Sequence, residues 1–250
     1  MSGFAGQRWQ AGPTWPVPGL AGALGAIALY FMLQVGVGSG LYALLSAREL
    51  LAEADRRALT VVLTVPVAGG LSLWAVHRTW PLAWRTAAVP GLGLARGARP
   101  VDYGLALVIG LSWPLLGGWL TQLLAGDRQI HQHVREMGAA AGIGLRVPLA
   151  LLAVTLAPMV EEVLFRGVLL SALARRWTGP VAVLGSALLF AFAHLPDLDF
   201  NFLAMPELLV LGLALAWLRL RSGSLWPAIL AHGLHNLPAA LAWFAAPLAG

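Results

Sequence analysis

Residues 147–174 read VPLALLAVTLAPMVEEVLFRGVLLSALA, an apolar run interrupted by two adjacent glutamates and one arginine. A run of this length is sufficient for a helix that spans a bilayer, which needs about 20 residues. A carboxylate or guanidinium at membrane depth costs at least ~2.5–3.5 kcal/mol on insertion scales. Glu161, Glu162 and Arg166 are therefore expected to face one another or water. Glu162 and Arg166 are four residues apart, so they lie on one helix face and can pair.

The composition of the whole chain extends this interpretation to a membrane protein. The 250 residues are 59% hydrophobic and 11% charged, and the mean hydropathy is +0.77. Soluble domains carry about 25% charged residues. Because backbone polar groups in lipid must be paired within their own segment, the fold class expected is all-α, a polytopic transmembrane helix bundle. About seven spans are predicted, at residues 19–45, 59–76, 103–125, 147–174, 180–195, 203–220 and 224–246.

The stretches inside and between the spans give a coarse organisation. The glycines of GVGSG (36–40) are expected to interrupt the first span, and Pro66 with the pair Gly69 and Gly70 the second. Residues 77–102 are rich in Pro, Gly and Arg and predict an interfacial loop, whereas residues 127–142 are compatible with a short amphipathic surface helix. Two regions are predicted, namely an N-terminal membrane region (1–146) and a second domain (147–240).

The charged residues narrow the classes of partner. All sixteen basic residues are arginine, the formal net charge is +5, and cysteine is absent. The arginines are scattered rather than collected on one stripe, so no nucleic acid is expected as a partner. Their expected role is to anchor helix ends at the lipid headgroups. The Ala/Arg-rich, lysine-free composition suggests a GC-rich bacterial genome, and hence a location in the bacterial inner membrane.

Polar residues on two other spans are candidates to meet the acidic pair. His194 ends the fifth span, and His232 and Asn236 lie four residues apart on the seventh, with His235 beside them. Counting 1.5 Å per residue from the short loop at 175–179 places Glu161 and His194 at similar depths of about 21 and 22 Å. His232 and Asn236 lie at about 12 and 18 Å from the same side. His235 is expected to form a helix–helix hydrogen bond.

These residue types favour hydrolysis by an activated water. A carboxylate beside a neutral histidine can hold and deprotonate water, and an imidazole and an amide on a facing helix can stabilise a developing oxyanion. Neither a G-x-S-x-G serine nor a cysteine nucleophile is present in the sequence. Histidines and a glutamate from separate helices are also zinc ligands, so zinc is the alternative chemistry. The sequence leaves both routes open.

Three motifs in order resemble a known family. EEVLFR (161–166), FAFAH (190–194) and HGLHN (232–236) match its E-E-x-x-x-R, F-x-x-x-H and H-x-x-x-N motifs. The family is the CPBP intramembrane proteases, which include CAAX prenyl endopeptidases of the Rce1 type and bacterial Abi proteins. The resemblance implies an endopeptidase, widely labelled metal-dependent, that acts on a membrane-associated protein or peptide within the lipid bilayer.

The same resemblance implies a role for each motif residue. Glu161 would be the general base on water, and His194 would help to hold that water. His232 and Asn236 would form the oxyanion site. Glu162 and Arg166 would support the others.

Two functions of other classes remain open at this point. Intramembrane Glu, His and Arg residues also serve transporters and proton relays, although transporters often show internal repeats that this chain lacks. A non-catalytic membrane factor, such as a bacteriocin-immunity protein, could keep the motifs as structure alone.

Overall fold

The structure is a computed structural model that describes residues 15–48, 51–95, 97–128 and 130–246. Residues 1–14, the start of the predicted N-terminal region, lie outside this description. The described residues form helices and no strand, which confirms the predicted all-α class. The long helices are α1 (Leu20–Ser46), α2 (Glu53–Thr79), α4 (Pro100–Ala125), α9 (Gly179–Ala193), α10 (Met205–Ser222) and α11 (Trp226–Ala245).

One further long helix runs from residue 143 to 174 and contains two π-helical turns. Its parts are α6 (Ile143–Leu151), η1 (Leu152–Leu156), α7 (Ala157–Glu162), η2 (Val163–Leu169) and α8 (Leu170–Ala174). The short elements outside it are α3 (Pro81–Arg85), α5 (His133–Ala140), η3 (Leu195–Leu198) and η4 (Phe202–Ala204). The helix α5 lies within the stretch 127–142 that predicted a short surface helix.

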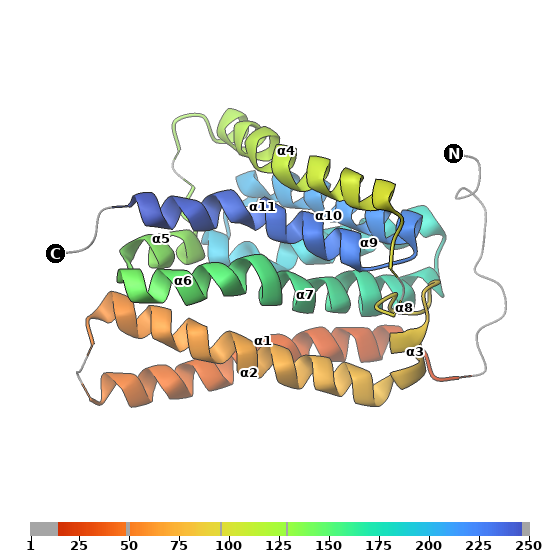
Figure 1. Ribbon diagram of the computed structural model, residues 1–250, viewed down its shortest axis with the longest axis horizontal. Helices are drawn as coiled ribbons and strands as arrows, with labels where there is room; N and C mark the ends of the chain where they lie inside the picture. Colours follow the sequence, from red (N-terminus) through yellow and green to blue (C-terminus); the bar gives the residue numbers. More distant parts are fainter. Residues whose placement is uncertain (1–14, 49–50, 96, 129, 247–250) are drawn as a thin grey trace.

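The long helices lie side by side along the long axis of the molecule (Figure 1). The pair α1 and α2 packs on one side of the 143–174 helix, and α4 packs against α10 and α11. Every residue from Val163 to Ala174 is buried, so η2 and α8 form the centre of the bundle. Side chains on this central helix can therefore meet partners from several other helices.

Within the residues that the structure describes, five helical segments are long and apolar enough to cross a membrane. They are Leu20–Ser46, Glu53–Thr79, Pro100–Ala125, Ile143–Ala174 and Phe202–Ser222. The helix α9 has 15 residues, which is about 22 Å and shorter than a typical hydrocarbon core. The predicted total of seven spans stays a prediction, but each predicted span coincides with a helix of the bundle.

The expected interruptions of the first two spans are wrong. The helix α1 continues through the glycines at 36–40, and α2 continues through Pro66 and the glycine pair. In lipid, a broken helix would leave backbone N–H and C=O groups without water or a partner. The cost of such unpaired groups exceeds the cost of placing glycine in a helix. A proline is tolerated because neighbouring groups can satisfy the carbonyl that loses its donor.

The expectation that the arginines anchor helix ends at the headgroups is wrong for Arg146 and Arg219, and Arg166, which was expected to face the glutamates, is buried as well. Arg146, Arg166 and Arg219 are at most 1% exposed. Arg219 donates from Nη2 to the carbonyls of Ala87 (2.8 Å) and Gly91 (2.6 Å), which fastens the predicted interfacial loop to the end of α10. These guanidiniums hold backbone carbonyls or a carboxylate inside the protein, because their donors would be too costly to bury unpaired.

We predict that a methyl group at Gly110 destabilises the bundle where α4 crosses α11. A Cβ there would lie 2.6 Å from the Ala231 carbonyl oxygen and 2.7 Å from the Leu234 Cβ. Such overpacking costs about 1–3 kcal/mol. Gly110→Ala should therefore lower the midpoint of thermal unfolding in detergent. Gly104→Ala, on the same helix with nothing within 4 Å, should leave it unchanged or raise it; equal midpoints would contradict this account.

Candidate active site

Glu162 is the buried centre of a hydrogen-bonded network of charged and polar side chains. Its Oε1 accepts hydrogen bonds from Arg166 Nη1 at 2.8 Å and from His232 Nδ1 at 2.9 Å. Arg166 also donates to the Gly212 carbonyl at 3.3 Å, and its guanidinium lies 4.1 Å from the centre of the Phe190 ring. The ion pair expected from the four-residue spacing of Glu162 and Arg166 is therefore present, and both side chains are fully buried.

Glu161 points to a different set of partners. Its Oε2 lies 3.5 Å from His194 Nε2 and 3.8 Å from His232 Nε2. Among the described residues, this oxygen has no hydrogen-bond partner. The structure thus brings together one side chain from α7, one from the end of α9 and one from α11.

The contacts of Nδ1 in His194 and His232 show which ring nitrogen carries the hydrogen. Nδ1 of His194 is 2.8 Å from the Phe190 carbonyl oxygen, and Nδ1 of His232 is bonded to Glu162. Carbonyl and carboxylate oxygens only accept hydrogen bonds, so each Nδ1 carries the hydrogen. In the neutral rings, both Nε2 atoms then present lone pairs. Three acceptor atoms therefore face one another, namely Glu161 Oε2 and the Nε2 atoms of His194 and His232.

These residues line a cavity of about 1400 Å³, which we call the polar cavity. Its wall includes Glu161, His194, His232 and Asn236, and it extends to Arg135 on α5. Helices from both halves of the chain contribute to this wall. The site therefore has room for a peptide segment as well as for water.

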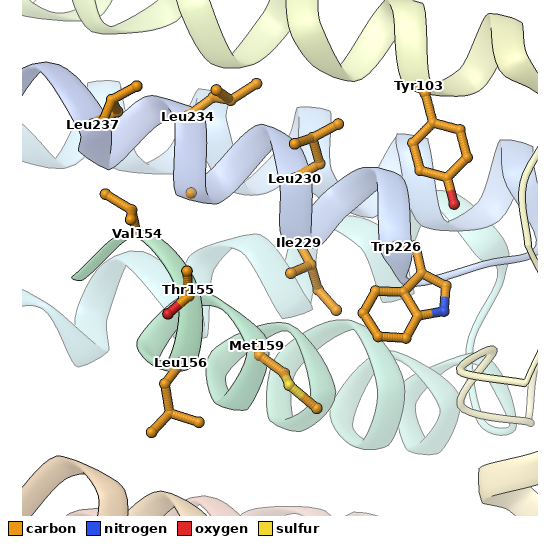
Figure 2. Close-up of a pocket in the computed structure, with 11 residues that line it drawn as sticks. Tyr103, Val154, Thr155, Leu156, Met159, Trp226, Ile229, Leu230, Leu234 and Leu237 are labelled. Carbon is orange, nitrogen blue, oxygen red and sulfur yellow. The ribbon is translucent and has the colours of Figure 1, made fainter. Parts of the chain in front are cut away.

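A second pocket of about 590 Å³ has a different character, and we call it the apolar groove (Figure 2). In the described part of the chain its wall has no carboxylate, histidine or arginine. The groove offers no acid or base, so the polar cavity is the candidate active site. The residues drawn along the groove include Tyr103, Val154, Met159, Trp226, Leu230 and Leu237.

Comparison with known proteins identifies the family of the segment that carries this site. Residues 143–238 match the family described as type II CAAX prenyl endopeptidase Rce1-like. We refer to this matching segment as the Rce1-like domain. The family is one of proteases, and the apolar helices of this chain agree with an integral membrane protein.

A curated relative covers part of the chain. Over 79 residues the chain is 40% identical to an uncharacterized 24.3 kDa protein of Escherichia coli, which is 31% of this chain and 36% of that protein. The match therefore spans about a third of the relative's length. No solved structure matches the chain significantly.

Asn236 of the Rce1-like domain is tied to the backbone of η1. In this π turn, the Ala157 N–H bonds to the Leu152 carbonyl five residues earlier. The next donor in the same register would be residue 158, which is a proline without an N–H. The Ala153 carbonyl is thereby left for the Asn236 Nδ2, which donates to it at 2.9 Å. One of the two amide hydrogens predicted to serve an oxyanion is therefore engaged elsewhere.

The expected hydrogen bond of His235 between helices is not formed at Nδ1. This buried atom has no hydrogen-bond partner among the described residues. His235 lines the polar cavity together with His232. The side chain of His235 therefore belongs to the wall of the polar cavity.

The fit of the site to zinc depends on the side chains that could serve as its ligands. One carboxylate and two imidazoles are donor types that catalytic zinc accepts. Within the described ranges, however, no group of three or more His, Cys, Asp or Glu side chains is arranged to hold a metal ion. As arranged, the side chains form no ready zinc site, and zinc stays the alternative chemistry; the steps below use the acid and the bases alone.

Sequence analysis missed residues of the cavity wall that lie outside or beside the motifs. Tyr30 and Gln34 reach the polar cavity from α1, and Glu207 reaches it from α10. Glu207 accepts a hydrogen bond from Thr121 Oγ1 at 2.8 Å. The available signal was a polar pair at four-residue spacing within an otherwise apolar stretch of the first span.

We predict that removing the guanidinium of Arg166 strongly destabilises the Rce1-like domain. Arg166→Met leaves the Glu162 carboxylate buried without its cation, which costs about 3–5 kcal/mol. The midpoint of thermal unfolding should fall well below that of the wild type. Arg176→Met, at an exposed position beyond the same helix, is the control and should change little. Adding Glu162→Gln to Arg166→Met should recover part of the loss; no recovery would argue against a coupled pair.

Proposed function

We propose that the Rce1-like domain is an intramembrane endopeptidase that hydrolyses a peptide bond of a membrane-associated protein or peptide, with Glu161 as general base. The observation that carries this proposal is the convergence of Glu161 Oε2 with the Nε2 atoms of His194 and His232. Three acceptors at this distance repel one another unless a proton donor lies between them. A water molecule donates two hydrogen bonds and can therefore bridge two of these acceptors, Glu161 Oε2 and His194 Nε2.

The chemistry follows from this placement. The water oxygen attacks the carbonyl carbon, one proton passes to Glu161, and the carbonyl π electrons move to the oxygen. The tetrahedral intermediate then collapses, the C–N bond breaks, and the proton on Glu161 passes to the leaving nitrogen. His194 holds the water through Nε2, and Glu162 with Arg166 fixes the ring of His232.

The substrate class is inferred from the family description and from the setting of the site. The family description refers to prenylated CAAX ends, and a prenyl anchor is one way to hold a peptide at a membrane. The polar cavity lies inside a bundle with five candidate spans, which supports a substrate delivered from the bilayer. We place the protein in the bacterial inner membrane on the basis of its composition.

We expect Glu161→Ala and His194→Ala to remove cleavage while the protein still accumulates in the membrane. Loss of general-base catalysis lowers rates about 10²–10⁴-fold. Comparative membrane proteomics of cells that express wild type or Glu161→Ala should reveal peptides cut only in the wild type. Glu136→Ala, at an exposed position bonded to His131, is the matched control. Equal peptide sets in wild type and Glu161→Ala would refute the protease function, and gradient-driven flux in liposomes would instead indicate a transporter.

A separate prediction concerns whether hydrolysis requires a metal ion. Because the described acidic and histidine side chains form no three-ligand group, we expect hydrolysis to continue after the purified protein is chelated. The measurement is the cleavage rate beside the metal content of the same sample. Loss of activity that zinc restores would replace the glutamate route by the zinc route.

A further inference from the structure

The motif residues offer few hydrogen-bond donors for the transition state of amide hydrolysis. Negative charge develops on the carbonyl oxygen, and preorganised donors at that oxygen are usually the largest single contribution to catalysis. His232 donates its Nδ1 hydrogen to Glu162, and Asn236 donates one amide hydrogen to the Ala153 carbonyl. Only the second Asn236 N–H is left from the pair predicted to form the oxyanion site. The cavity therefore needs a donor from another element.

Helix α1 carries suitable side chains, although it lies outside the Rce1-like domain. Tyr30 and Gln34 are four residues apart, so they share one face of α1. Both line the polar cavity, and α1 packs against η2, which follows the acidic pair. Glu161 belongs to the wall of the same cavity, so the Tyr30 hydroxyl and the Gln34 amide share that cavity with the acid.

The position of Tyr30 is not that of an interfacial aromatic residue. Tyrosines that mark the membrane surface lie at headgroup level. Tyr30 lies ten residues into a helix of 27 residues, or about 15 Å from its start. Its side chain is 2% exposed, so the hydroxyl does not reach the headgroups. A hydroxyl buried at this depth is costly unless it has a partner, and the cavity is where that partner can bind.

We propose that the Tyr30 hydroxyl donates a hydrogen bond to the carbonyl oxygen of the scissile peptide bond as that oxygen becomes negative. Gln34 is a positioning residue, because an amide that donates to the Tyr30 oxygen leaves the O–H directed into the cavity. Tyr30 keeps its proton throughout. The attacking water gives its proton to Glu161, and the carbonyl electron pair that moves to oxygen is stabilised by the Tyr30 O–H. This inference rests on the proposed endopeptidase function.

The test compares matched phenylalanine variants of one helix. Tyr42 lies on α1 three turns after Tyr30, and its hydroxyl donates to Glu53 rather than to the cavity. A synthetic peptide that contains a Glu161-dependent cleavage site, found by the membrane proteomics, is the substrate for the purified full-length protein. Tyr30→Phe should lower kcat roughly 100-fold with KM little changed, as expected for the loss of an oxyanion donor. Tyr42→Phe should leave kcat unchanged.

Gln34 is tested through its dependence on Tyr30. Gln34→Leu should lower kcat by less than Tyr30→Phe does, with KM little changed. The double variant should be no slower than Tyr30→Phe alone, because Gln34 acts only through the hydroxyl. A further loss in the double variant would refute the positioning role. Thermal unfolding of all variants identifies a change in kcat that comes from misfolding.

The two proposals fail in distinguishable ways. If no peptide is cut in a Glu161-dependent manner, the endopeptidase function fails, and the role of Tyr30 fails with it. If Glu161→Ala is inactive but Tyr30→Phe keeps full kcat at unchanged stability, only the role of Tyr30 is refuted. Equal losses of kcat in Tyr30→Phe and Tyr42→Phe would also refute it, because the effect would then belong to α1 in general.

Discussion

The buried bond between Glu162 and Arg166 is the constraint on which the site depends. Both side chains are removed from solvent, so each is tolerable only in the presence of the other. Glu162 also accepts from His232 Nδ1, which sets the tautomer of that ring and directs its Nε2 toward Glu161. The ion-paired Glu162 thus determines which nitrogen of His232 carries the lone pair. The two adjacent glutamates reach different partners because neighbouring residues of a helix point about 100° apart.

A proline and a π turn provide the second constraint. Pro158 cannot donate a hydrogen bond, and in the register of η1 the carbonyl left without its donor is that of Ala153. Asn236 satisfies this carbonyl and so joins α11 to the central helix. Close by, the backbone of Gly233 approaches the Val154 carbonyl so closely that a Cβ would lie 2.3 Å from it. This close approach, one residue after His232, adds a second contact between α11 and the central helix.

The wall of the polar cavity extends beyond the residues that match a known family. Residues 143–238 supply the acid, the histidines and the asparagine, but α1 supplies Tyr30 and Gln34 to the same wall. The N-terminal helices therefore do more than surround the Rce1-like domain with apolar surface. In a membrane, where water is scarce, a polar group on any helix is costly unless it reaches this cavity or a partner. The same energetic rule explains why Arg146 and Arg219 hold backbone carbonyls inside the protein.

The sequence by itself determined the helices, because the hydropathy of a segment is a local property, and each predicted span coincides with a helix. It also predicted the Glu162–Arg166 pair, since a spacing of four residues sets one helix face without reference to other elements. The equal depth of Glu161 and His194 followed from the shared loop between their helices. Only the tertiary structure decided the continuity of α1 and α2, the burial of Arg146 and Arg219, the bond of Asn236 and the approach of Tyr30. These depend on which helix packs against which, and residues far apart in the chain set that packing.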